Sequence, residues 1–355
     1  MVSVFLLRVL SGTSSASVPD LAVVDPIIFI VGGLNFMERN IWKDGIFGLV
    51  VGDALGVPVE FSAREELKRY PVTGMRAYGT HNQPAGTWSD DSSMTFATLE
   101  SIKQKGGVDN KDMMDKFSRW CLYADYTPFH DVFDIGRATS QAIFRYGKGC
   151  APTESGGKGE RDNGNGSLMR ILPVCLYLYH RQKSICTSED ESIYIIHNAS
   201  ALTHAHARSQ IACGIYYFMV KAVIEKTGNL IERLQYGIDE ACRYYRRDLR
   251  NKTELEHFSR IFDLKVFEKL PQKLIKSSGY VVDTLEAVIW CLLTTASFQD
   301  AILQAVNLGD DTDTVGAITG GLAGLYYGYD AIPAEWVNAL QRREWIEELV
   351  SEMEE

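Results

Sequence analysis

The sequence predicts an all-α protein in which roughly a dozen helices pack around one core. Three observations favour this fold class. Apolar residues recur at intervals of three and four along most of the chain. Strand-like alternation of apolar and polar residues is scarce, and strands do not alternate with helices. No internal repeat of fixed period is visible, so we expect one compact domain of many helices.

The expected helices are spread over the whole chain after residue 40. Helical periodicity covers residues 40–56, 92–105, 111–122, 133–146, 167–181, 200–227, 229–246, 284–297, 298–306, 314–328 and 334–350. The clearest long loop, 146–166, is rich in glycine and joins two helical halves.

Two of the expected helices carry glycine at every fourth position, at 48, 52 and 56 and at 316, 320, 324 and 328. An interior glycine costs about 1 kcal/mol relative to alanine in a helix. Such stripes need compensation, for which close approach of a neighbouring helix backbone is the physical candidate. A membrane dimer is the competing interpretation, but the uncharged run Val315–Tyr329 is shorter than the roughly 20 residues that span a bilayer. We therefore expect two central helices of a soluble bundle.

The composition is that of a soluble globular protein, with 355 residues, 46% of them hydrophobic and 23% charged. The net charge is −10, and lysine and arginine are scattered along the chain. This argues against nucleic acid and membranes as partners, and we expect a monomer. The seven cysteines are odd in number and form no CxxC pair. They predict reduced thiols in a cytoplasmic protein rather than disulfides or a thiolate zinc site.

Residues 1–36 differ from the rest of the chain. An apolar run at the start is broken by Arg8, and Pro26–Leu34 is too short to span a bilayer. An amphipathic segment then begins at Met37. We expect 1–36 to be an N-terminal extension outside the core, Met37 to be the natural start, and 37–355 to form the functional domain.

Two acidic clusters each stand directly before an expected helix. The first acidic cluster, Ser89–Ser92, reads S-D-D-S, and the second acidic cluster, Asp310–Thr314, reads D-D-T-D-T. Serine, threonine and aspartate at a helix N-terminus cap free N–H groups and suit the helix dipole. One such residue suffices for capping, whereas several neighbouring acids repel one another.

Divalent cations offer a second explanation for the surplus acids. Clusters that present only oxygen ligands suit hard ions, Mg²⁺, Mn²⁺ or Ca²⁺, better than zinc. Two clusters brought face to face would hold two ions about 3.5–4 Å apart, the spacing used in metal-assisted hydrolysis. Neither cluster continues into an EF-hand loop. The pattern alone leaves a metal site and elaborate capping both open.

Two further acids favour the metal site. Asp53 lies in a segment with no other charge between Asp44 and Glu60, so we expect it to be buried and to need a partner. Glu60 follows Pro58, which ends the helix and places Glu60 in a loop. A buried carboxyl beside metals can act as an acid or a base, whereas the alternative for Glu60 is an ordinary exposed loop acid.

Five motifs then occur in order along the chain. They are G-D-A-L-G-V-P-V-E-F (52–61), G-T-W-S-D-D-S-S-M (86–94), D-N-G-N-G-S-L-M-R (162–170), T-H (203–204) and G-D-D-T-D-T-V-G-A-I-T-G (309–320). Together they resemble the ADP-ribosylglycohydrolase family, whose members include the hydrolase that reactivates ADP-ribosylated dinitrogen reductase. The match extends from about Trp42 to Leu340. It implies an all-α fold with two Mg²⁺ or Mn²⁺ ions in a cleft.

The resemblance also implies a set of metal ligands. Carried over by position, they are Ser89, Asp90 and Asp91 from the first acidic cluster, and Asp311, Asp313 and Thr314 from the second. Asp310 occupies a position that is typically glycine in the family, so it is expected beside the ligands rather than among them. Ser89 and Ser92 stand where threonine is frequent, and both keep the hydroxyl group.

Catalytic and substrate-binding roles are implied in the same way. Glu60 would handle the proton on a water beside the metals or on the scissile linkage, and Asp134 matches a second acid of the arginine-directed branch. The glycine-rich loop Asn163, Gly164, Asn165, Gly166 and Ser167 would hold the diphosphate and distal ribose, in keeping with anion binding by backbone N–H groups. A flexible connector is the alternative for that loop. His204 matches a histidine near the ribose, although a lone histidine on a helix is more often structural.

The expected activity is metal-dependent hydrolysis of the N- or O-glycosidic bond that links ADP-ribose to a protein side chain. One alternative is hydrolysis of small ADP-ribose derivatives such as O-acetyl-ADP-ribose. A non-catalytic, crystallin-like binding or structural protein is the other, and the presence of all the matched acids argues against it. The sequence does not distinguish arginine from serine or another acceptor, or Mg²⁺ from Mn²⁺.

Overall fold

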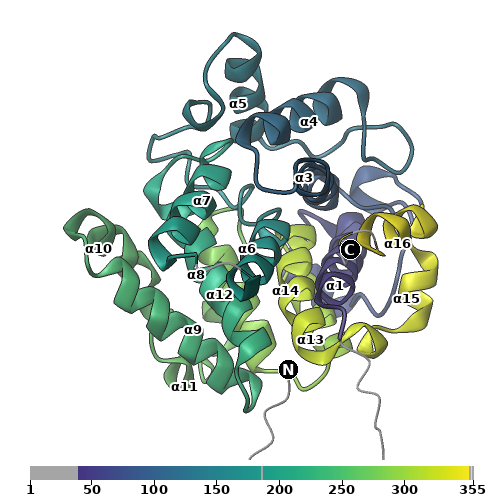
Figure 1. Cartoon of the computed structure of the whole chain (residues 1–355). Coiled ribbons are helices and arrows are strands. Elements are labelled where there is room, and N and C mark those ends of the chain that lie inside the picture. Colours follow the sequence, from purple (N-terminus) through teal and green to yellow (C-terminus); the bar gives the residue numbers. More distant parts are fainter. Residues whose placement is uncertain (1–38, 185–186, 352, 354–355) are drawn as a thin grey trace, which may run out of the picture. The chain divides into compact units, whose positions relative to one another are not determined.

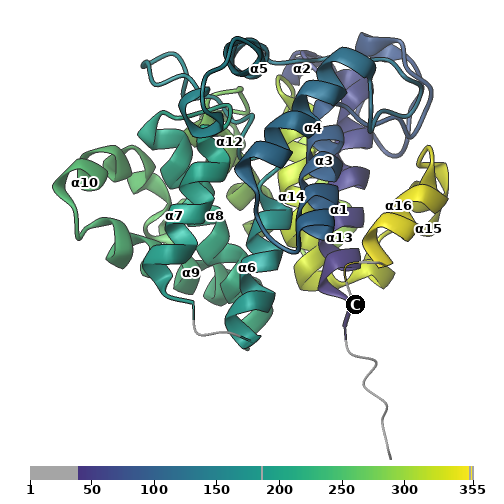
Figure 2. The same cartoon turned by 45° about the horizontal axis from the view of Figure 1, so that its top comes forward.

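Two antiparallel helices run through the middle of the described part of the protein (Figures 1 and 2). They are α1 (Ile41–Gly56) and α14 (Thr312–Tyr327), and nearly every residue of both is buried. Their glycines face one another. A Cβ on Gly52 would lie 2.1 Å from the Gly316 carbonyl oxygen, and one on Gly320 would lie 2.0 Å from that of Gly48. The expected close backbone approach is confirmed, and each glycine stripe is the partner of the other.

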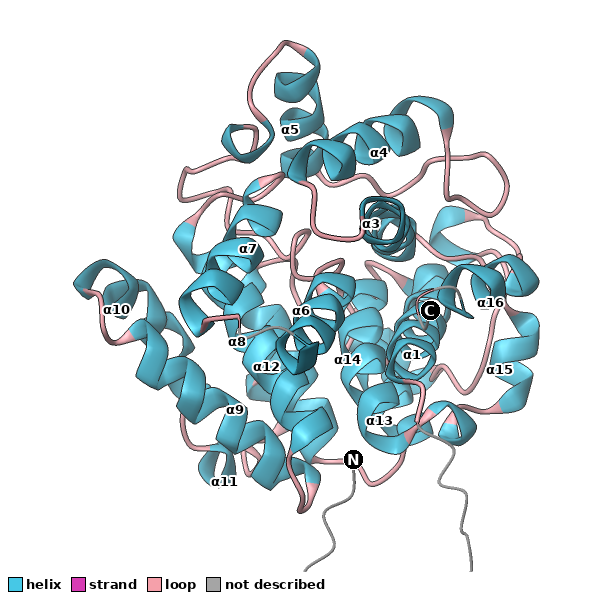
Figure 3. Ribbon diagram, viewed as in Figure 1, coloured by secondary structure: helices cyan, strands magenta, loops and turns pink. Residues whose placement is uncertain are grey.

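The remaining helices surround this pair (Figure 3). The computed structural model describes residues 39–184, 187–351 and 353, which contain sixteen α-helices and no sheet, so the all-α prediction is confirmed. Besides α1 and α14, the α-helices are α2 (Arg64–Arg69), α3 (Asp90–Lys105), α4 (Asn110–Tyr123), α5 (Arg137–Gly147), α6 (Leu172–Ser184), α7 (Glu189–Ala201), α8 (Ala207–Glu225), α9 (Leu230–Tyr245), α10 (Leu249–Leu255), α11 (Leu264–Phe267), α12 (Val281–Leu293), α13 (Phe298–Val306), α15 (Ala334–Ala339) and α16 (Arg343–Ser351). Short 3₁₀ helices cover Val57–Val59, Gly79–His81, Pro152–Glu154, Glu256–Ile261, Gln272–Leu274 and Tyr329–Ala331.

Some expected helices are wrong where the chain turns inside an apolar run. The segment 200–227 contains a turn between α7 and α8, so His204 lies between helices and not on one. The segment 133–146 becomes helical only at Arg137, which leaves Asp134 in a loop with a φ of +54°. Residues 334–350 form two helices, because the chain leaves the helical conformation at Leu340, with a ψ of 131°, and Arg342 then adopts a left-handed φ of +47°. Periodicity does not reveal these turns, since the apolar side chains on both sides enter the same core.

Two other expectations concern the membrane and the thiols. Among the described residues, no helix combines the length and apolar character that crossing a bilayer requires. The six cysteines described are all free thiols, and four of them are buried. The expected N-terminal extension, 1–36, and the expected start at Met37 lie outside the described residues.

Candidate metal centre

The first acidic cluster forms the N-terminus of α3. Ser89 is the N-cap residue, and its Oγ accepts a hydrogen bond from Asp91 N at 3.3 Å. Asp53, on α1, reaches the same helix end, where its carboxylate accepts from Ser89 N at 3.0 Å, Ser92 N at 3.0 Å and Ser92 Oγ at 2.5 Å. Ser89 and Asp53 therefore satisfy the N–H groups of Ser89, Asp91 and Ser92 at the start of α3, and Asp91 is not needed as a cap.

The second acidic cluster forms the N-terminus of α14. Asp311 is the N-cap residue, but its side chain caps no N–H group of the helix and accepts instead from Asn165 Nδ2 at 2.7 Å. Asp313 Oδ1 accepts from Thr314 N at 3.0 Å. Thr314 Oγ1 donates to Asp91 Oδ1 at 3.2 Å, and this hydrogen bond joins the two acidic clusters directly.

The packing of α1 on α14 brings the clusters together. At the end of α1, a Cβ on Gly56 would lie 2.3 Å from Asp313 Cα, and the Thr312 hydroxyl donates to the Gly56 carbonyl at 2.8 Å. Asp53 lies about one helical turn before Gly56, next to the same helix end. The glycines that weaken each helix thus allow the second acidic cluster to approach Asp53.

Backbone hydrogen bonds tie the loop of Glu60 to the second acidic cluster. Phe61 N donates to the Asp310 carbonyl at 2.7 Å, and Asp310 N donates to the Ser62 carbonyl at 3.0 Å. Phe61 and Asp310 are both left-handed, with φ of +61° and +65°. Such conformations cost about 1–3 kcal/mol for residues other than glycine. The reciprocal hydrogen bonds hold Glu60 beside Asp311 against this strain.

Seven carboxyl groups meet where these elements converge, those of Asp53, Glu60, Asp90, Asp91, Asp134, Asp311 and Asp313. One carboxylate oxygen from each of Asp53, Asp91 and Asp313 lies within 4.8 Å of the other two. The same holds for Glu60, Asp311 and Asp313. Because Asp313 belongs to both groups of three, the two groups are adjacent, as two neighbouring cation sites would require.

Burial raises the pKa of all seven carboxyl groups. Loss of water is the largest cause throughout. It raises the pKa of Asp53 to about 6. Together with repulsion from neighbouring carboxylates, it raises the pKa of Asp134 to about 7 and that of Glu60 to about 10, and it lifts the pKa of Asp91 well above its ordinary value. The neighbouring charges with the largest effects on Glu60, Asp90 and Asp91 are all carboxylates.

Two of the buried oxygens, Asp91 Oδ2 and Asp313 Oδ2, have no hydrogen-bond partner among the described residues. An unpartnered buried polar atom costs about 1–3 kcal/mol, and more for a charged group. The groups around them are carboxylate and hydroxyl oxygens, which suit Mg²⁺, Mn²⁺ or Ca²⁺. These residues fit a centre of hard divalent cations, whose charge would offset the repulsion between the carboxylates.

Sequence reasoning missed the partner of Glu60. His81 Nε2 hydrogen-bonds Glu60 Oε2, and the Thr80 hydroxyl donates to the Glu60 carbonyl at 2.6 Å. Burial lowers the pKa of His81 and, together with repulsion from neighbouring carboxylates, raises that of Glu60, so both shifts favour the neutral form of each group. No motif marks His81 in the sequence G-T-H-N-Q, and only the fold places it beside Glu60.

A cleft of about 310 Å³ opens beside the carboxyl groups. The predicted site residues that line it are Glu60, Asp90, Asp134, Gly164, Asn165, Gly166, His204, Asp311 and Thr314. Ser89, Asp91 and Asp313 are buried and are not part of the lining. The cleft therefore unites the acidic clusters with the glycine-rich loop.

The glycine-rich loop is anchored at several points. Asn165 Nδ2 donates to Asp311 Oδ2 and, at 2.9 Å, to Thr284 Oγ1, which links the loop to the second acidic cluster and to α12. The Asn163 carbonyl accepts from Val281 N at 3.2 Å, whereas Ser167 Oγ bonds Ser200 Oγ at 2.8 Å inside the core. The side chains of Asn163 and Ser167 do not line the cleft, and their part in substrate binding stays a prediction.

A chain of hydrogen bonds fixes the tautomer of His204. Arg170 is fully buried and donates from Nη2 to Thr203 Oγ1 at 2.7 Å, and Thr203 Oγ1 lies 2.9 Å from His204 Nδ1. Because Arg170 is only a donor, the buried Thr203 hydroxyl finds its acceptor in Nδ1, and the proton of His204 resides on Nε2. Burial and then the charge of Arg170 lower the pKa of His204 to about 3. His204 is thus a neutral N–H donor at the cleft, with Nε2 next to Gly164 and Gly166.

The site can now be compared with known proteins. The family model described as ADP-ribosylglycohydrolase matches residues 39–355. The ADP-ribosylarginine hydrolase Tri1 of Serratia proteamaculans is 32% identical over 88% of this chain and 78% of its own. The ADP-ribosyl-[dinitrogen reductase] glycohydrolase of Rhodospirillum rubrum is 30% identical over 83% and 88%. A solved structure described as an ADP-ribosylglycohydrolase-related protein complex superposes with a TM-score of 0.71 and 31% identity, covering 89% of this chain and 98% of that one.

Proposed function

The chain belongs to the ADP-ribosylglycohydrolase family, and on this premise we propose that it removes ADP-ribose from arginine side chains of proteins by metal-dependent hydrolysis. The observation that carries the proposal is the pair of buried, unpartnered oxygens, Asp91 Oδ2 and Asp313 Oδ2, between two acidic helix ends. Arginine is favoured as the acceptor because the relative at 32% identity is named an ADP-ribosylarginine hydrolase. The position of Asp134 in the cleft supports the same choice.

The residues proposed to hold two Mg²⁺ or Mn²⁺ ions are Ser89, Asp90, Asp91, Asp311, Asp313 and Thr314. Asp53, on α1, belongs to one of the groups of three carboxylates and lies beside the ligands Asp91 and Asp313. Bound there, the ions would supply Lewis-acid chemistry and offset negative charge that develops as the glycosidic bond opens.

Glu60 is the proposed acid and base of the reaction. Hydrolysis breaks the bond between the anomeric carbon and the guanidinium nitrogen. The oxygen of a water molecule bonds to the carbon, and one proton of that water ends on the nitrogen. Glu60 lines the cleft and its carboxyl shares a hydrogen bond with His81, so it can take up and return a proton at this place.

The glycine-rich loop and His204 are proposed to hold the ADP-ribose. Gly164, Asn165 and Gly166 line the cleft, where backbone groups approach an anion closely. The Nε2–H of His204 adds a neutral donor suited to a ribose hydroxyl or a phosphate oxygen. One chain contributes every one of these residues, which supports a monomer as the acting form. The six cysteines among the described residues, all free thiols, fit the reducing cytoplasm.

A turnover panel tests the proposal. ADP-ribosylarginine, ADP-ribosylserine and O-acetyl-ADP-ribose are offered to the protein with Mg²⁺, with Mn²⁺ and with excess EDTA. We expect release of ADP-ribose from the arginine-linked substrate in the presence of either metal and loss of that activity in EDTA. Undiminished turnover in EDTA would contradict the metal requirement. Turnover confined to O-acetyl-ADP-ribose would contradict the proposed substrate.

A further inference from the structure

The cleft adjoins a second hollow that no part of the proposed mechanism uses. This hollow, about 490 Å³ in volume, is called the basic groove here, and its lining includes Arg64, Lys68, Lys273 and Lys276. Phe61 and Asp310 line both the cleft and the basic groove, so the two are adjacent. Phe61 is 64% exposed at this junction.

We propose that the basic groove binds an acidic segment of the ADP-ribosylated protein, close to its modified arginine. The inference rests on the proposed function and adds the kind of protein substrate that the site selects.

The two ends of the cleft have different linings. Gly164, Gly166 and His204 line the cleft but not the basic groove, and they are the residues proposed to hold ADP-ribose. The acceptor arginine and the polypeptide that carries it must leave the anomeric carbon in another direction. Phe61 and Asp310, both exposed, mark the side of the cleft that adjoins the basic groove, and a polypeptide leaving on this side would pass over the groove.

Two of the four cations in the basic groove are committed to the fold. Arg64 donates to the Leu308 carbonyl at 2.6 Å and to the Gln272 carbonyl at 2.8 Å, which ties α2 to both neighbouring loops. Lys68 pairs with Glu65 at 2.6 Å.

The other two cations are available to a partner. Lys273 and Lys276 are exposed, and neither forms an ion pair with the described residues. Lys276 exerts a weak pull on Glu286, whose own ion-pair partner is Arg260. The protein carries a net charge of −10, so most of its surface repels an acidic segment. A local pair of unpaired lysines beside the cleft would therefore select and orient such a segment.

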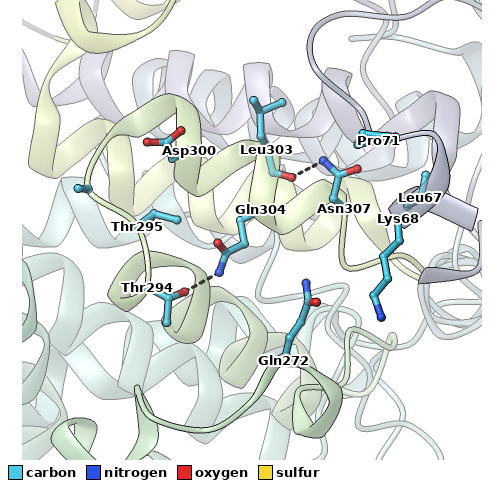
Figure 4. A pocket seen from close by; sticks show the side chains of 11 residues that line it. Leu67, Lys68, Pro71, Gln272, Thr294, Thr295, Asp300, Leu303, Gln304 and Asn307 are labelled. Carbon is cyan, nitrogen blue, oxygen red and sulfur yellow. Dashed lines mark hydrogen bonds between the residues drawn. The ribbon is translucent and has the colours of Figure 1, made fainter. Parts of the chain in front are cut away.

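A further pocket extends the same path along α13. It has a volume of about 590 Å³ and shares Lys68 with the basic groove. Figure 4 shows Lys68 and Gln272 extending toward the same space, with the amides of Gln304 and Asn307 nearby. Both amides are already held by the fold, since Gln304 donates to Thr294 and Asn307 bonds the N–H and the C=O group of Val72. The lining of this pocket carries one cation, Lys68, and one anion, Asp300, among polar and apolar residues.

The test compares three arginine-linked substrates of ADP-ribose. One is ADP-ribosylarginine itself, and the others are peptides in which the modified arginine is flanked by glutamate or by lysine. Because Asp310 is exposed at the junction, the flanking charges are placed two to five residues from the arginine. We expect the wild type to prefer the glutamate peptide, with a preference that shrinks as salt is raised from 0.05 to 0.5 M.

The decisive variant is Lys273→Glu/Lys276→Glu. We expect it to raise KM for the glutamate peptide about tenfold, because attraction becomes repulsion, while ADP-ribosylarginine is hydrolysed as by the wild type. Lys252→Glu/Lys265→Glu is the matched control, since both lysines are exposed and line neither the cleft nor the groove. It makes the same change in net charge and should leave all three substrates unaffected.

Each outcome bears on one claim. If the wild type hydrolyses ADP-ribosylarginine but the groove variant keeps its KM for the glutamate peptide, the basic groove is not the docking surface and the proposed function stands. An equal effect of the control variant would assign the change to net charge and would also overturn the inference. If the wild type hydrolyses none of the three substrates, the proposed function fails, and the inference fails with it.

Discussion

The N-termini of α3 and α14 carry similar acidic sequences but use them differently. At α3, the side chains of Ser89 and Asp53 accept from the N–H groups of Ser89, Asp91 and Ser92, and Asp91 is left over. At α14, the side chain of the N-cap residue makes no capping hydrogen bond. Each end nevertheless leaves one buried carboxylate oxygen without a partner, and both oxygens belong to the same group of three acids. At α14 one acid, Asp313, accepts from the free N–H group of Thr314, whereas Asp91 at α3 accepts from no N–H group of its helix, so capping does not account for all the acids of either cluster.

Removal of the carboxylate of Asp91 or of Asp313 should have the largest effect on activity, and the effect should be similar at the two helix ends. Asp91→Asn and Asp313→Asn keep the shape of the side chain but remove a charge that a divalent cation requires. We expect turnover of ADP-ribosylarginine to fall about 10³-fold in each. Mn²⁺ should no longer raise the melting temperature of either variant. Asp330→Asn, at an exposed position, is the control, and turnover within twofold of the wild type in either cluster variant would contradict the account.

Glu60→Gln tests whether proton transfer can be removed while metal binding by the two acidic clusters is kept. The amide can neither take up nor release a proton in the reaction, so we expect kcat to fall about 10²- to 10³-fold. Stabilisation by Mn²⁺ should persist, because Asp91 and Asp313 are unchanged. Glu66→Gln, on exposed α2, should behave as the wild type. Loss of Mn²⁺ binding together with activity would place Glu60 among the ligands instead.

Gly52→Ala tests whether close helix packing keeps the clusters aligned. The added Cβ would lie 2.1 Å from the Gly316 carbonyl oxygen, so α1 and α14 must move apart. We expect a loss of about 3 kcal/mol in the free energy of unfolding, measured by denaturant titration, and weaker Mn²⁺ binding. Gly147→Ala, where a Cβ meets no atom within 4 Å, should leave stability nearly unchanged. An equally small effect at Gly52 would refute the packing argument.

The response to pH should show that protons and cations compete for the clusters. Folding raises the pKa of Asp53 from 3.8 to about 6 and that of Asp134 to about 7. The folded, cation-free protein therefore binds more protons than the unfolded chain. The contribution of these bound protons to the free energy of unfolding is lost as the pH rises through 6 and 7. Bound Mn²⁺ replaces those protons, so the rise in melting temperature that Mn²⁺ produces should grow between pH 5.5 and 8. A rise that is independent of pH would speak against this coupling.

Thr203→Val changes a residue that lies outside both acidic clusters and hydrogen-bonds His204 at the cleft. We expect its effect on activity to be the smallest of these variants. Valine cannot hydrogen-bond His204 Nδ1, so the proton is no longer held on Nε2. We expect KM to rise about fivefold, equivalent to one hydrogen bond, with little change in kcat. Nitrogen NMR of His204 should show mixed tautomers, and Thr203→Ser should restore both properties. An unchanged spectrum in the valine variant would show that Thr203 does not set the tautomer.

The fold and the two acidic clusters could be predicted from sequence because their signals are local. Helical periodicity predicted the bounds of α1, α9 and α13 within a residue or two. The spacing of the glycines predicted the close packing of α1 against α14. Acids beside hydroxyl groups marked both cluster positions. These features depend on residues that stand near one another in the chain.

The remaining features depend on residues that are distant in sequence. His81 acquires its role only because a loop folds back onto Glu60. The turn around His204 contains no glycine or proline that would announce it. Asp53 was expected to be buried, but it caps the N-terminus of α3 only because α1 packs beside that helix end. No local pattern records such contacts.

Titration of Mn²⁺ onto the metal-free protein is the most direct test of the claim that both acidic clusters bind the same ions. Calorimetry on the wild type, Asp91→Asn and Asp313→Asn counts the ions bound to each. We predict two Mn²⁺ per wild-type chain and weakened binding of both in either variant, because Asp313 belongs to both groups of three and Asp91 is hydrogen-bonded to Thr314 of the second acidic cluster. A variant that loses one ion while the other binds as in the wild type would show two separate sites and would contradict the account.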